Sequence, residues 1–332
     1  MQSVTIIGLG LIGGSIGLGL RRWSSANGDA LRIVGFDENI DKQSRAKAIG
    51  AVDAVEWSLA KSLSNADVVI VATPVGAMST IFEDIGPHLK QGAVVTDTGS
   101  TKADVLDWAR TLPSHVDFIG GHPMAGRSES LEAADADLFT GATWVVCPSV
   151  TAAESSVRTV LGIIAAVGAD AFFVDPTEHD SYVAGISHLP FVVAASLMET
   201  VANDQAWRDM KTLSATGLRD TTRLALGNPQ MHRDILHSNS AAISRWIDSF
   251  TATLQNLKTE LEAGNEEAAD SLLAFFTKAQ DDRASLEVVT SRVSEQATLS
   301  AAEMSKENVS EQMGRMFLGG LGRRRAPRNP KS

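Results

Sequence analysis

The 332-residue sequence has a single cysteine, Cys147, so no disulfide can form within the chain and no metal site can be built from several cysteines. It also lacks any continuous apolar run of the ~18 residues that a membrane span needs. Met1 leads directly into the mainly apolar residues 4–7, without the basic and small residues of a signal peptide. These absences predict a soluble, cytoplasmic protein with no metal and no membrane partner.

Basic residues are the minority: 29 Lys and Arg against 40 Asp and Glu give a formal charge of −11. A field of this sign repels phosphate backbones, so nucleic acid is not expected as a partner. Hydrophobic residues make up 44% and charged residues 21%, which is the balance of a globular protein. The length is sufficient for two domains.

The first half of the chain alternates short apolar runs with longer amphipathic stretches. Such runs, separated by helices of crossover length, predict a parallel sheet covered on both faces. The predicted strands span residues 4–8, 31–37, 67–73, 93–97, 118–120, 143–147 and 171–174. The predicted helices between them span residues 11–22, 40–49, 76–85, 101–110 and 152–167.

After Pro176 the strand patterns stop, and helices are predicted near residues 182–198, 204–214, 229–239, 240–263 and 266–297. The first of these is apolar nearly all round, which favours burial in a homodimer, and Pro190 predicts a kink or break within it. We therefore divide the chain into a first domain over residues 1–175 and a helical domain over residues 176–300. The Gly-, Pro- and Arg-rich residues 319–332 predict a disordered basic tail, which is more often a solvated chain end than an arm for an anionic partner.

A glycine motif, Gly-Leu-Gly-Leu-Ile-Gly at residues 8–13, follows the first predicted strand and begins the first helix. Gly8 permits a tight turn, Gly10 lets the backbone approach a pyrophosphate, and Gly13 allows close packing of helix on strand. Leu11 and Ile12 begin the helix whose free N–H groups attract phosphate. The motif predicts dinucleotide binding, and with it an α/β fold: a doubly wound parallel sheet of the Rossmann type, then a C-terminal all-helical dimerisation domain.

Asp37 ends the second predicted strand, where a carboxylate accepts hydrogen bonds from a ribose and repels a 2′-phosphate. The expected cofactor is therefore NAD rather than NADP.

Three further segments are too polar for their apolar surroundings: residues 96–102, 120–126 and 187–190. The first follows a predicted strand at the edge of the sheet where ligands bind. The second presents His122 between two glycines and a proline, and the third places Ser187 and His188 within an apolar helix, where polar groups need a partner or a ligand. Together they predict a substrate site.

The chain resembles the prephenate and arogenate dehydrogenases, which oxidise a cyclohexadienol to a tyrosine precursor. The matching segments are Gly-Leu-Gly-Leu-Ile-Gly-Gly-Ser (8–15), Asp-Thr-Gly-Ser-Thr-Lys (97–102), Gly-Gly-His-Pro-Met-Ala-Gly (120–126), Ser-His-Leu-Pro (187–190) and Gly-Leu-Arg-Asp-Thr-Thr-Arg (217–223). They occur in family order over residues 1 to about 290.

The resemblance implies a role for each matching residue. His122 would take the proton of the ring 4-hydroxyl as hydride leaves, and Ser100 would orient His122 and contact the same hydroxyl. Arg223 would pair with a substrate carboxylate, and Ser187 would line the pocket. The polar groups that gate the site in the family correspond to His179 and Asp180, and those beside the nicotinamide correspond to Thr73 and Pro74.

Three positions depart from the family pattern: Phe191 replaces a frequent histidine or glutamine, Arg127-Ser128 replaces a threonine or serine followed by glutamate, and His232 replaces a tryptophan found in some relatives. Arg127 could supply a second carboxylate contact. The residues leave prephenate and arogenate both open as substrates.

Two other functions remain as alternatives. A β-hydroxyacid dehydrogenase or imine reductase shares the architecture, and the former depends on a lysine for which Lys211 is the candidate, outside any motif. A nucleotide-sensing module without catalysis would not need to keep Ser100, His122 and Arg223.

Overall fold

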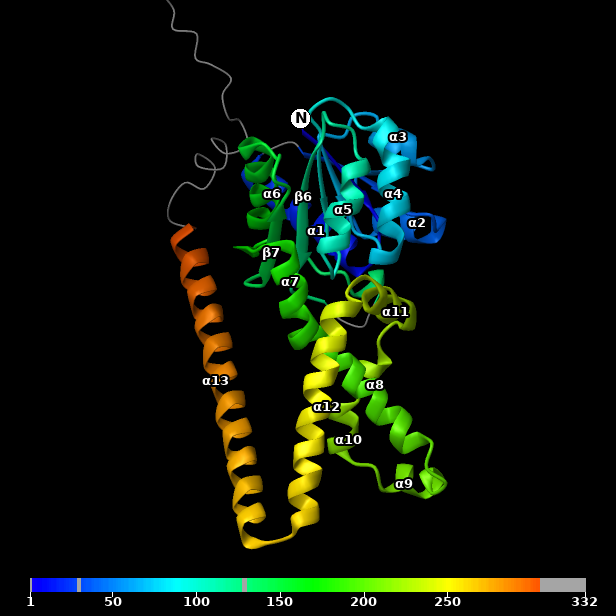
Figure 1. Ribbon diagram of the computed structural model, residues 1–332. Coiled ribbons are helices and arrows are strands. Elements are labelled where there is room, and N and C mark those ends of the chain that lie inside the picture. The colour runs from blue at the N-terminus through cyan, green and yellow to red at the C-terminus, as the bar shows by residue number, and fades with distance from the viewer. Residues whose placement is uncertain (1, 29–30, 127–129, 305–332) are drawn as a thin grey trace, which may run out of the picture.

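The computed structural model describes residues 2–28, 31–126 and 130–304, with side chains up to residue 286. The predicted basic tail at 319–332 and Arg127 lie outside these residues. Two parts are visible in Figure 1, a sheet with helices on both sides and a helical part below it.

The sheet has eight strands in the order β3-β2-β1-β4-β5-β6-β7-β8. Their bounds are β1 Gln2–Ile7, β2 Leu31–Phe36, β3 Ala54–Val55, β4 Val68–Val71, β5 Val94–Asp97, β6 Asp117–Pro123, β7 Thr143–Pro148 and β8 Asp170–Phe173. The predicted doubly wound sheet is confirmed, with β3 added at its edge.

The expectation that all strands run parallel is wrong for the last two. Strand β7 pairs antiparallel with β6, and β8 pairs parallel with β7, so both run against the other six. A parallel pair needs a crossover connection, usually a helix. The connection from β6 to β7 contains only the short turn η4, Leu131–Ala133, whereas a full helix, α6, joins β7 to β8.

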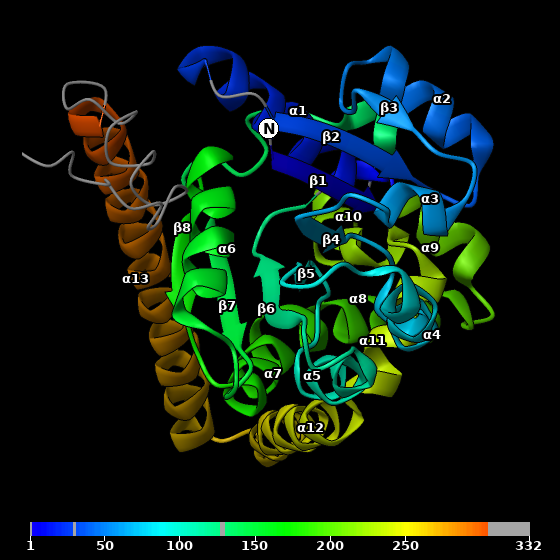
Figure 2. The ribbon, with the colours of Figure 1, turned by 90° about the horizontal axis from the view of Figure 1, so that it is seen from above.

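Helices cover both faces of the sheet. They are α1 Leu11–Asn27, α2 Ile40–Ala48, α3 Leu59–Leu63, α4 Met78–Ile85, α5 Ala103–Trp108 and α6 Glu154–Ala166, with the short turn η1 at Val75–Ala77. Side chains of β4 alternate between the two faces of the sheet. Val68 and Ile70 belong to the core beneath α1 and α6. Val69 and Val71 belong to the core beneath α4 and α5. Figure 2 shows α3, α4 and α5 together on one side of the strands.

The helical part begins at Pro176. Its elements are α7 Pro176–Val183, the π-helical turn η5 Ala184–His188, α8 Leu189–Ala202, α9 Trp207–Leu213, α10 Thr216–Thr221, the turn η6 Arg223–Leu226, α11 Pro229–Ser238, α12 Ser240–Ala263 and α13 Glu266–Met304. Phe191, Ile235 and Ile243 join the core on the α4 side of the sheet, so one apolar core connects the two parts. Helices α12 and α13 form a long hairpin that extends away from the sheet (Figure 1).

The kink or break predicted at Pro190 takes the form of a local π turn within a continuous helix. The helix widens to a π turn over Ala184–His188, and Pro190 then lies in the first turn of α8, where its missing N–H removes no helical hydrogen bond. Because the three elements are continuous, Pro176–Ala202 is long and apolar enough to cross a membrane by length and composition alone, contrary to the expectation that no run would be. Only 28% of its most apolar stretch is buried within the chain.

Candidate active site

The three glycines after β1 have different surroundings. Gly8 has φ +93°, and a Cβ there would lie 2.5 Å from the Ala72 carbonyl oxygen; a Cβ on Gly13 would lie 2.0 Å from the Gly8 carbonyl oxygen. A Cβ on Gly10 would meet no described atom within 4 Å. Gly8 and Gly13 are therefore required by the packing of the chain, whereas Gly10 faces space that a ligand can fill.

This space lies at the start of α1. Gly10 is the N-cap residue and makes no capping hydrogen bond through a side chain, and Leu11 and Ile12 form the first helical positions. The N–H groups of a first helical turn have no partner within the helix and carry partial positive charge. The residues present therefore fit a pyrophosphate.

Asp37 lies directly after β2 and contacts the glycine loop. One carboxylate oxygen accepts a hydrogen bond from the Leu9 N–H at 2.8 Å, and the other accepts one from the Asn39 N–H at 2.9 Å. A carboxylate has about four lone-pair sites, so sites remain for the hydroxyls of a ribose.

Thr73 and Pro74 follow β4 at the same edge of the sheet. The Thr73 methyl carbon lies 3.0 Å from the position that a Cβ on Gly8 would take, so this segment borders the glycine loop. The Thr73 hydroxyl is buried and has no hydrogen-bond partner among the described residues. Pro74 is exposed at the start of η1.

His122 lies on β6, buried within the chain. Its Nδ1 is 2.9 Å from His179 Nε2, and His179 Nδ1 is 2.8 Å from Asp180 Oδ1. Burial lowers the pKa of His122 well below its ordinary value, and His179, Lys102 and His188 lower it further. At neutral pH the imidazole is therefore uncharged, which is the state that a general base needs.

In the described part of the chain the His122 ring makes its hydrogen bond with His179, not with Ser100 as expected. Ser100 is half-buried after β5, and no hydrogen bond joins it to His122 in the described part of the chain. Its contact with a substrate hydroxyl stays a prediction.

Asp180, expected among the polar groups that gate the site, bonds the backbone of a neighbouring helix. Its Oδ1 accepts from the Lys102 N–H at 2.7 Å and its Oδ2 from the Ala103 N–H at 2.9 Å, so both oxygens bond the start of α5. The side chain is buried behind His179. Since α5 has no capping side chain of its own, Asp180 supplies the cap from α7.

The structure contains a buried ion pair that the sequence does not predict, between Lys102 and Asp97. Both side chains are fully buried, and Asp97 also accepts hydrogen bonds from the N–H groups of Gly99, at 2.7 Å, and Gly121, at 2.9 Å. Asp97 thus joins the loop after β5 to the residue that precedes His122. The polar run 96–102 signalled a site, but nothing in it indicates that its lysine turns inward.

The other expected substrate residues lie in the helical part. Arg223, in η6, is exposed and has no ion pair or hydrogen bond with other described side chains. Ser187 is exposed in the π turn. No hydrogen bond joins either to His122 among the described residues.

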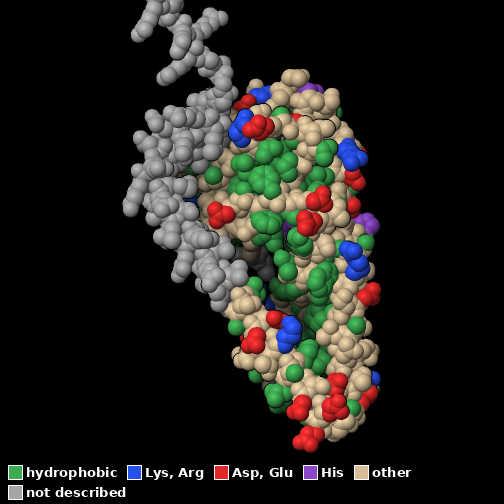
Figure 3. Space-filling model, turned by 60° about the vertical axis from the view of Figure 1, so that its left-hand side comes forward, with side chains coloured by type: hydrophobic (Ala, Val, Ile, Leu, Met, Phe, Trp, Pro, Cys, Tyr) green, Lys and Arg blue, Asp and Glu red, His purple; other side chains and the backbone are tan. Residues whose placement is uncertain are grey.

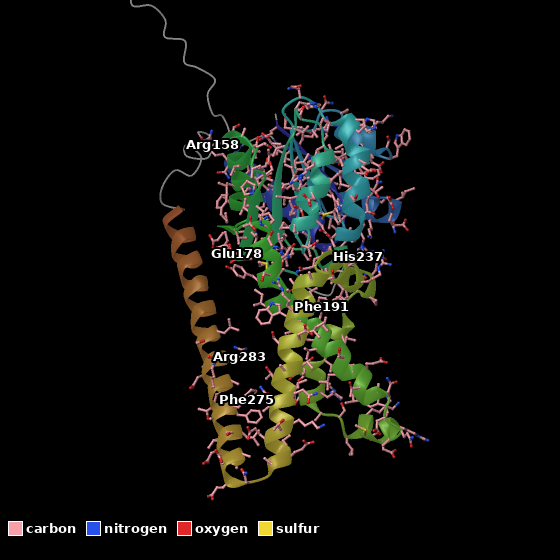
Figure 4. The ribbon with its side chains drawn as sticks, viewed as in Figure 1. Arg158, Glu178, Phe191, His237, Phe275 and Arg283 are labelled. Carbon is pink, nitrogen blue, oxygen red and sulfur yellow. The ribbon has the colours of Figure 1, made fainter. Side chains whose placement is uncertain are left out.

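His188 follows Ser187 and is fully buried. Its Nδ1 is 3.3 Å from Asn239 Nδ2, and the Asn239 amide donates to the Asp180 carbonyl oxygen at 2.7 Å. Burial lowers the pKa of His188 to about 4. Phe191 packs beside it at the junction of the sheet and the helical part (Figure 4).

A dinucleotide-binding sheet joined to a helical domain, with an uncharged histidine at the end of a strand between them, defines a nicotinamide-dependent dehydrogenase. Models of the prephenate dehydrogenase nucleotide-binding domain and of its dimerization domain match residues 16–172 and 175–278. The chain belongs to the prephenate dehydrogenase family.

Individual relatives agree with this assignment. The chain is 34% identical over 286 residues to the prephenate dehydrogenase of Bacillus subtilis. The aligned region covers 85% of this chain and 75% of that protein. It is similar to the structure of Aquifex aeolicus prephenate dehydrogenase in complex with hydroxyphenyl propionate and NAD+, with 30% identity, a TM-score of 0.79 and coverage of 86% and 98%. Synechocystis arogenate dehydrogenase matches with 27% identity, a TM-score of 0.71 and coverage of 85% and 100%.

Proposed function

We propose that this enzyme is an NAD-dependent prephenate dehydrogenase, which oxidises the ring alcohol of prephenate and releases the ring carboxylate as CO2 to give 4-hydroxyphenylpyruvate, a precursor of tyrosine. One observation supports the chemistry most directly: His122 is buried beside His179 and Lys102, which keeps its pKa low, and no hydrogen bond to its Nε2 is present in the described part of the chain. The relatives named for this activity support the choice of substrate.

The cofactor proposed is NAD. The open space at Gly10, the uncapped start of α1 and the carboxylate of Asp37 fit a dinucleotide without a 2′-phosphate. When bound, NAD supplies the acceptor for the hydride that leaves the ring alcohol carbon.

His122 has two tasks in this reaction. Its Nε2 takes the proton of the 4-hydroxyl as the hydride leaves, which produces a dienone. The bond from the ring to its carboxylate then breaks, and the electron pair makes the ring aromatic and places negative charge on the 4-oxygen. His122 returns its proton to that oxygen, so the base holds the proton only between the two steps. The low pKa of His122 favours this return.

The charged groups proposed for substrate binding are Arg223, whose guanidinium can hold a carboxylate in a bidentate pair, and Arg127. Ser187, Ser100, Thr73 and Pro74 are proposed to line the substrate and the nicotinamide. Asp180 contributes through His179 rather than by touching the substrate.

Arogenate, which carries an alanyl in place of the pyruvyl side chain, is the second candidate substrate. The similarity to Synechocystis arogenate dehydrogenase over 85% of the chain favours including it.

A cytoplasmic homodimer is the proposed assembly. Apolar side chains are exposed on η5, β8 and α12, among them Ile186 at 72%, Phe172 at 52% and Trp246 at 43%. Figure 3 shows one face of the molecule on which hydrophobic side chains gather over both the upper and the lower part. The match of the dimerization domain to residues 175–278 covers the apolar helix Pro176–Ala202, which supports a second subunit rather than a membrane as its cover.

The test is steady-state kinetics of the purified chain with prephenate and arogenate, each with NAD and NADP, following NADH and CO2. We expect equal amounts of both products, with prephenate and NAD preferred. The inactive control is His122→Asn, expected to lose roughly 10²–10⁴-fold in kcat. If coenzyme binds but neither substrate yields NADH, the proposal is wrong.

A further inference from the structure

Three buried side chains lie in series behind the reactive nitrogen of His122. His122, on β6, contacts His179, and His179 contacts Asp180; both histidine–histidine and histidine–carboxylate contacts are shorter than 3 Å. The two rings are nearly perpendicular, with centroids 5.1 Å apart and planes at 80°. The series crosses from the sheet to the helical domain, since His179 and Asp180 belong to α7.

The direction of each hydrogen bond follows from Asp180. Its two oxygens receive the backbone N–H groups of Lys102 and Ala103, which can only donate, so the carboxylate acts as an acceptor. His179 must then carry a proton on Nδ1 and donate it to Asp180. A neutral His179 has a bare Nε2, and this atom accepts from His122 Nδ1. What remains on His122 is a bare Nε2.

We propose that His179 and Asp180 are positioning residues that fix the tautomer of His122, so that its Nε2 carries the lone pair that takes the substrate proton. This inference rests on the proposed function for its catalytic meaning, but the tautomer itself is a property of the free protein.

Both ends of the series are attached to the fold. The Asp180 backbone carbonyl accepts from Asn239 at the start of α12, and its carboxylate holds the start of α5. At the other end, Asp97 bonds the Gly121 N–H next to His122 and pairs with the Lys102 ammonium. Since Lys102 belongs to both attachments, the hydrogen bonds close into a ring, and His122 cannot rotate or exchange its ring proton without breaking a buried contact.

The arrangement also matters once His122 has taken a proton. The imidazolium is then buried near Lys102, whose charge opposes it. A hydrogen bond from Nδ1 to His179, backed by the carboxylate of Asp180, offsets part of this repulsion. His179 and Asp180 thus keep the lone pair on His122 Nε2 free before proton transfer. After proton transfer, the Asp180 carboxylate stabilises the positive charge of His122.

The direct test uses the full chain labelled with nitrogen-15 in its histidine rings. A bare and a protonated ring nitrogen have distinct chemical shifts, and the His122 signals among the seven histidines are identified by their loss in His122→Asn. At neutral pH we expect a protonated Nδ1 and a bare Nε2 on His122. A protonated Nε2 in the wild-type spectrum overturns the proposal without any variant of the series.

A matched pair of variants links the tautomer to catalysis. His179→Phe keeps a ring of similar size but offers no acceptor, whereas His179→Gln keeps a carbonyl oxygen for His122 and an amide N–H for Asp180. We expect His179→Phe to lose the single tautomer and roughly 10²–10⁴-fold in kcat with little change in KM, and His179→Gln to recover most of both. Equal loss in the two variants with an unchanged His122 spectrum would show a merely structural role.

The two proposals fail separately. If the wild-type spectrum has the bare Nε2 but the chain oxidises neither prephenate nor arogenate, the tautomer assignment holds and the proposed function is wrong. If the wild type is active and His179→Phe keeps its kcat, the function holds and the positioning role is wrong.

Discussion

The rings of Phe191 and His232 are stacked, with centroids 4.2 Å apart and planes only 4° from parallel. Phe191 lies in the first turn of α8 and His232 lies on α11, so the stack joins two helices of the helical part. These are two of the positions at which the sequence departs from the family pattern. In the structure the two departures form one contact.

The stack predicts a measurable coupling between the two side chains. We expect Phe191→Leu and His232→Ala each to lower the free energy of unfolding, and the double variant to lose about 0.5–1.5 kcal/mol less than the sum, because the second substitution has no stack left to remove. Urea unfolding of the four proteins at one fixed protein concentration measures this. Strict additivity would show that the ring contact contributes nothing.

The same substitution, glycine to alanine, is predicted to have opposite effects at two positions of the glycine loop. Gly10→Ala should leave the melting temperature nearly unchanged but weaken NAD binding, because the new methyl group meets no protein atom and enters the space proposed for the pyrophosphate. Gly13→Ala should lower stability by about 1–3 kcal/mol, because its methyl group would overlap the Gly8 carbonyl. Thermal unfolding and NAD titration of both variants test the pair. Unimpaired NAD binding by Gly10→Ala would place the coenzyme elsewhere.

Asp37 is predicted to set the coenzyme preference. In Asp37→Ser the hydroxyl can still accept one backbone N–H, but the charged contact to the ribose and the repulsion of a 2′-phosphate are gone. A hydrogen bond to a charged group contributes about 1.5–3 kcal/mol, so kcat/KM for NAD should fall by roughly 10–100-fold. Activity with NADP should rise relative to NAD. If the ratio of the two coenzymes does not change, Asp37 only supports the loop through Leu9 and Asn39.

The sequence predicts the layers of the fold well because apolar runs and amphipathic helices are local signals. The strand β3 is two residues long, too short for such a signal. The direction of β7 depends on a connection without a crossover helix, and the apolar pattern of a strand is the same in either direction.

For the site, local motifs identified His122 and the glycine loop, but its partners are distant in the chain. His122 meets His179 across 57 residues, and Lys102 meets Asp180 across 78. Nothing in the spacing of these residues predicts that His179, rather than Ser100, bonds the base. Contacts of this kind follow only from how α7 packs against α5.

Stability is predicted to fall in acid partly because of His188. Its pKa is lowered to about 4 by burial, so below the ordinary histidine pKa of ~6.5 the unfolded chain binds a proton that the folded chain does not. His188 therefore does not change the free energy of unfolding above pH 7. As the pH falls from 6.5 to 4 it lowers that free energy progressively, by about 2 kcal/mol at pH 5. The free energy of unfolding should fall between pH 7.5 and pH 5 in both the wild type and His188→Gln. The fall should be smaller in His188→Gln by about the same amount. An equal loss in urea unfolding would show that His188 is protonated in the folded protein.

The pH dependence of kcat/KM is predicted to report His122. This ratio reflects the free enzyme, in which the base must be uncharged, so activity should rise with pH through the pKa of His122 and then stay level. Burial lowers that pKa, and the groups facing the ring act in the same direction: His179 from α7, Lys102 from the residue before α5, and His188 from η5. The acid limb of the profile should therefore lie below pH 6.5, and kcat/KM should be constant between pH 6.5 and 7.5. Rates are measured immediately after dilution from neutral pH, so that unfolding of the enzyme in acid is not mistaken for protonation of His122. A midpoint at or above pH 6.5 would mean that His122 is not the buried, uncharged base.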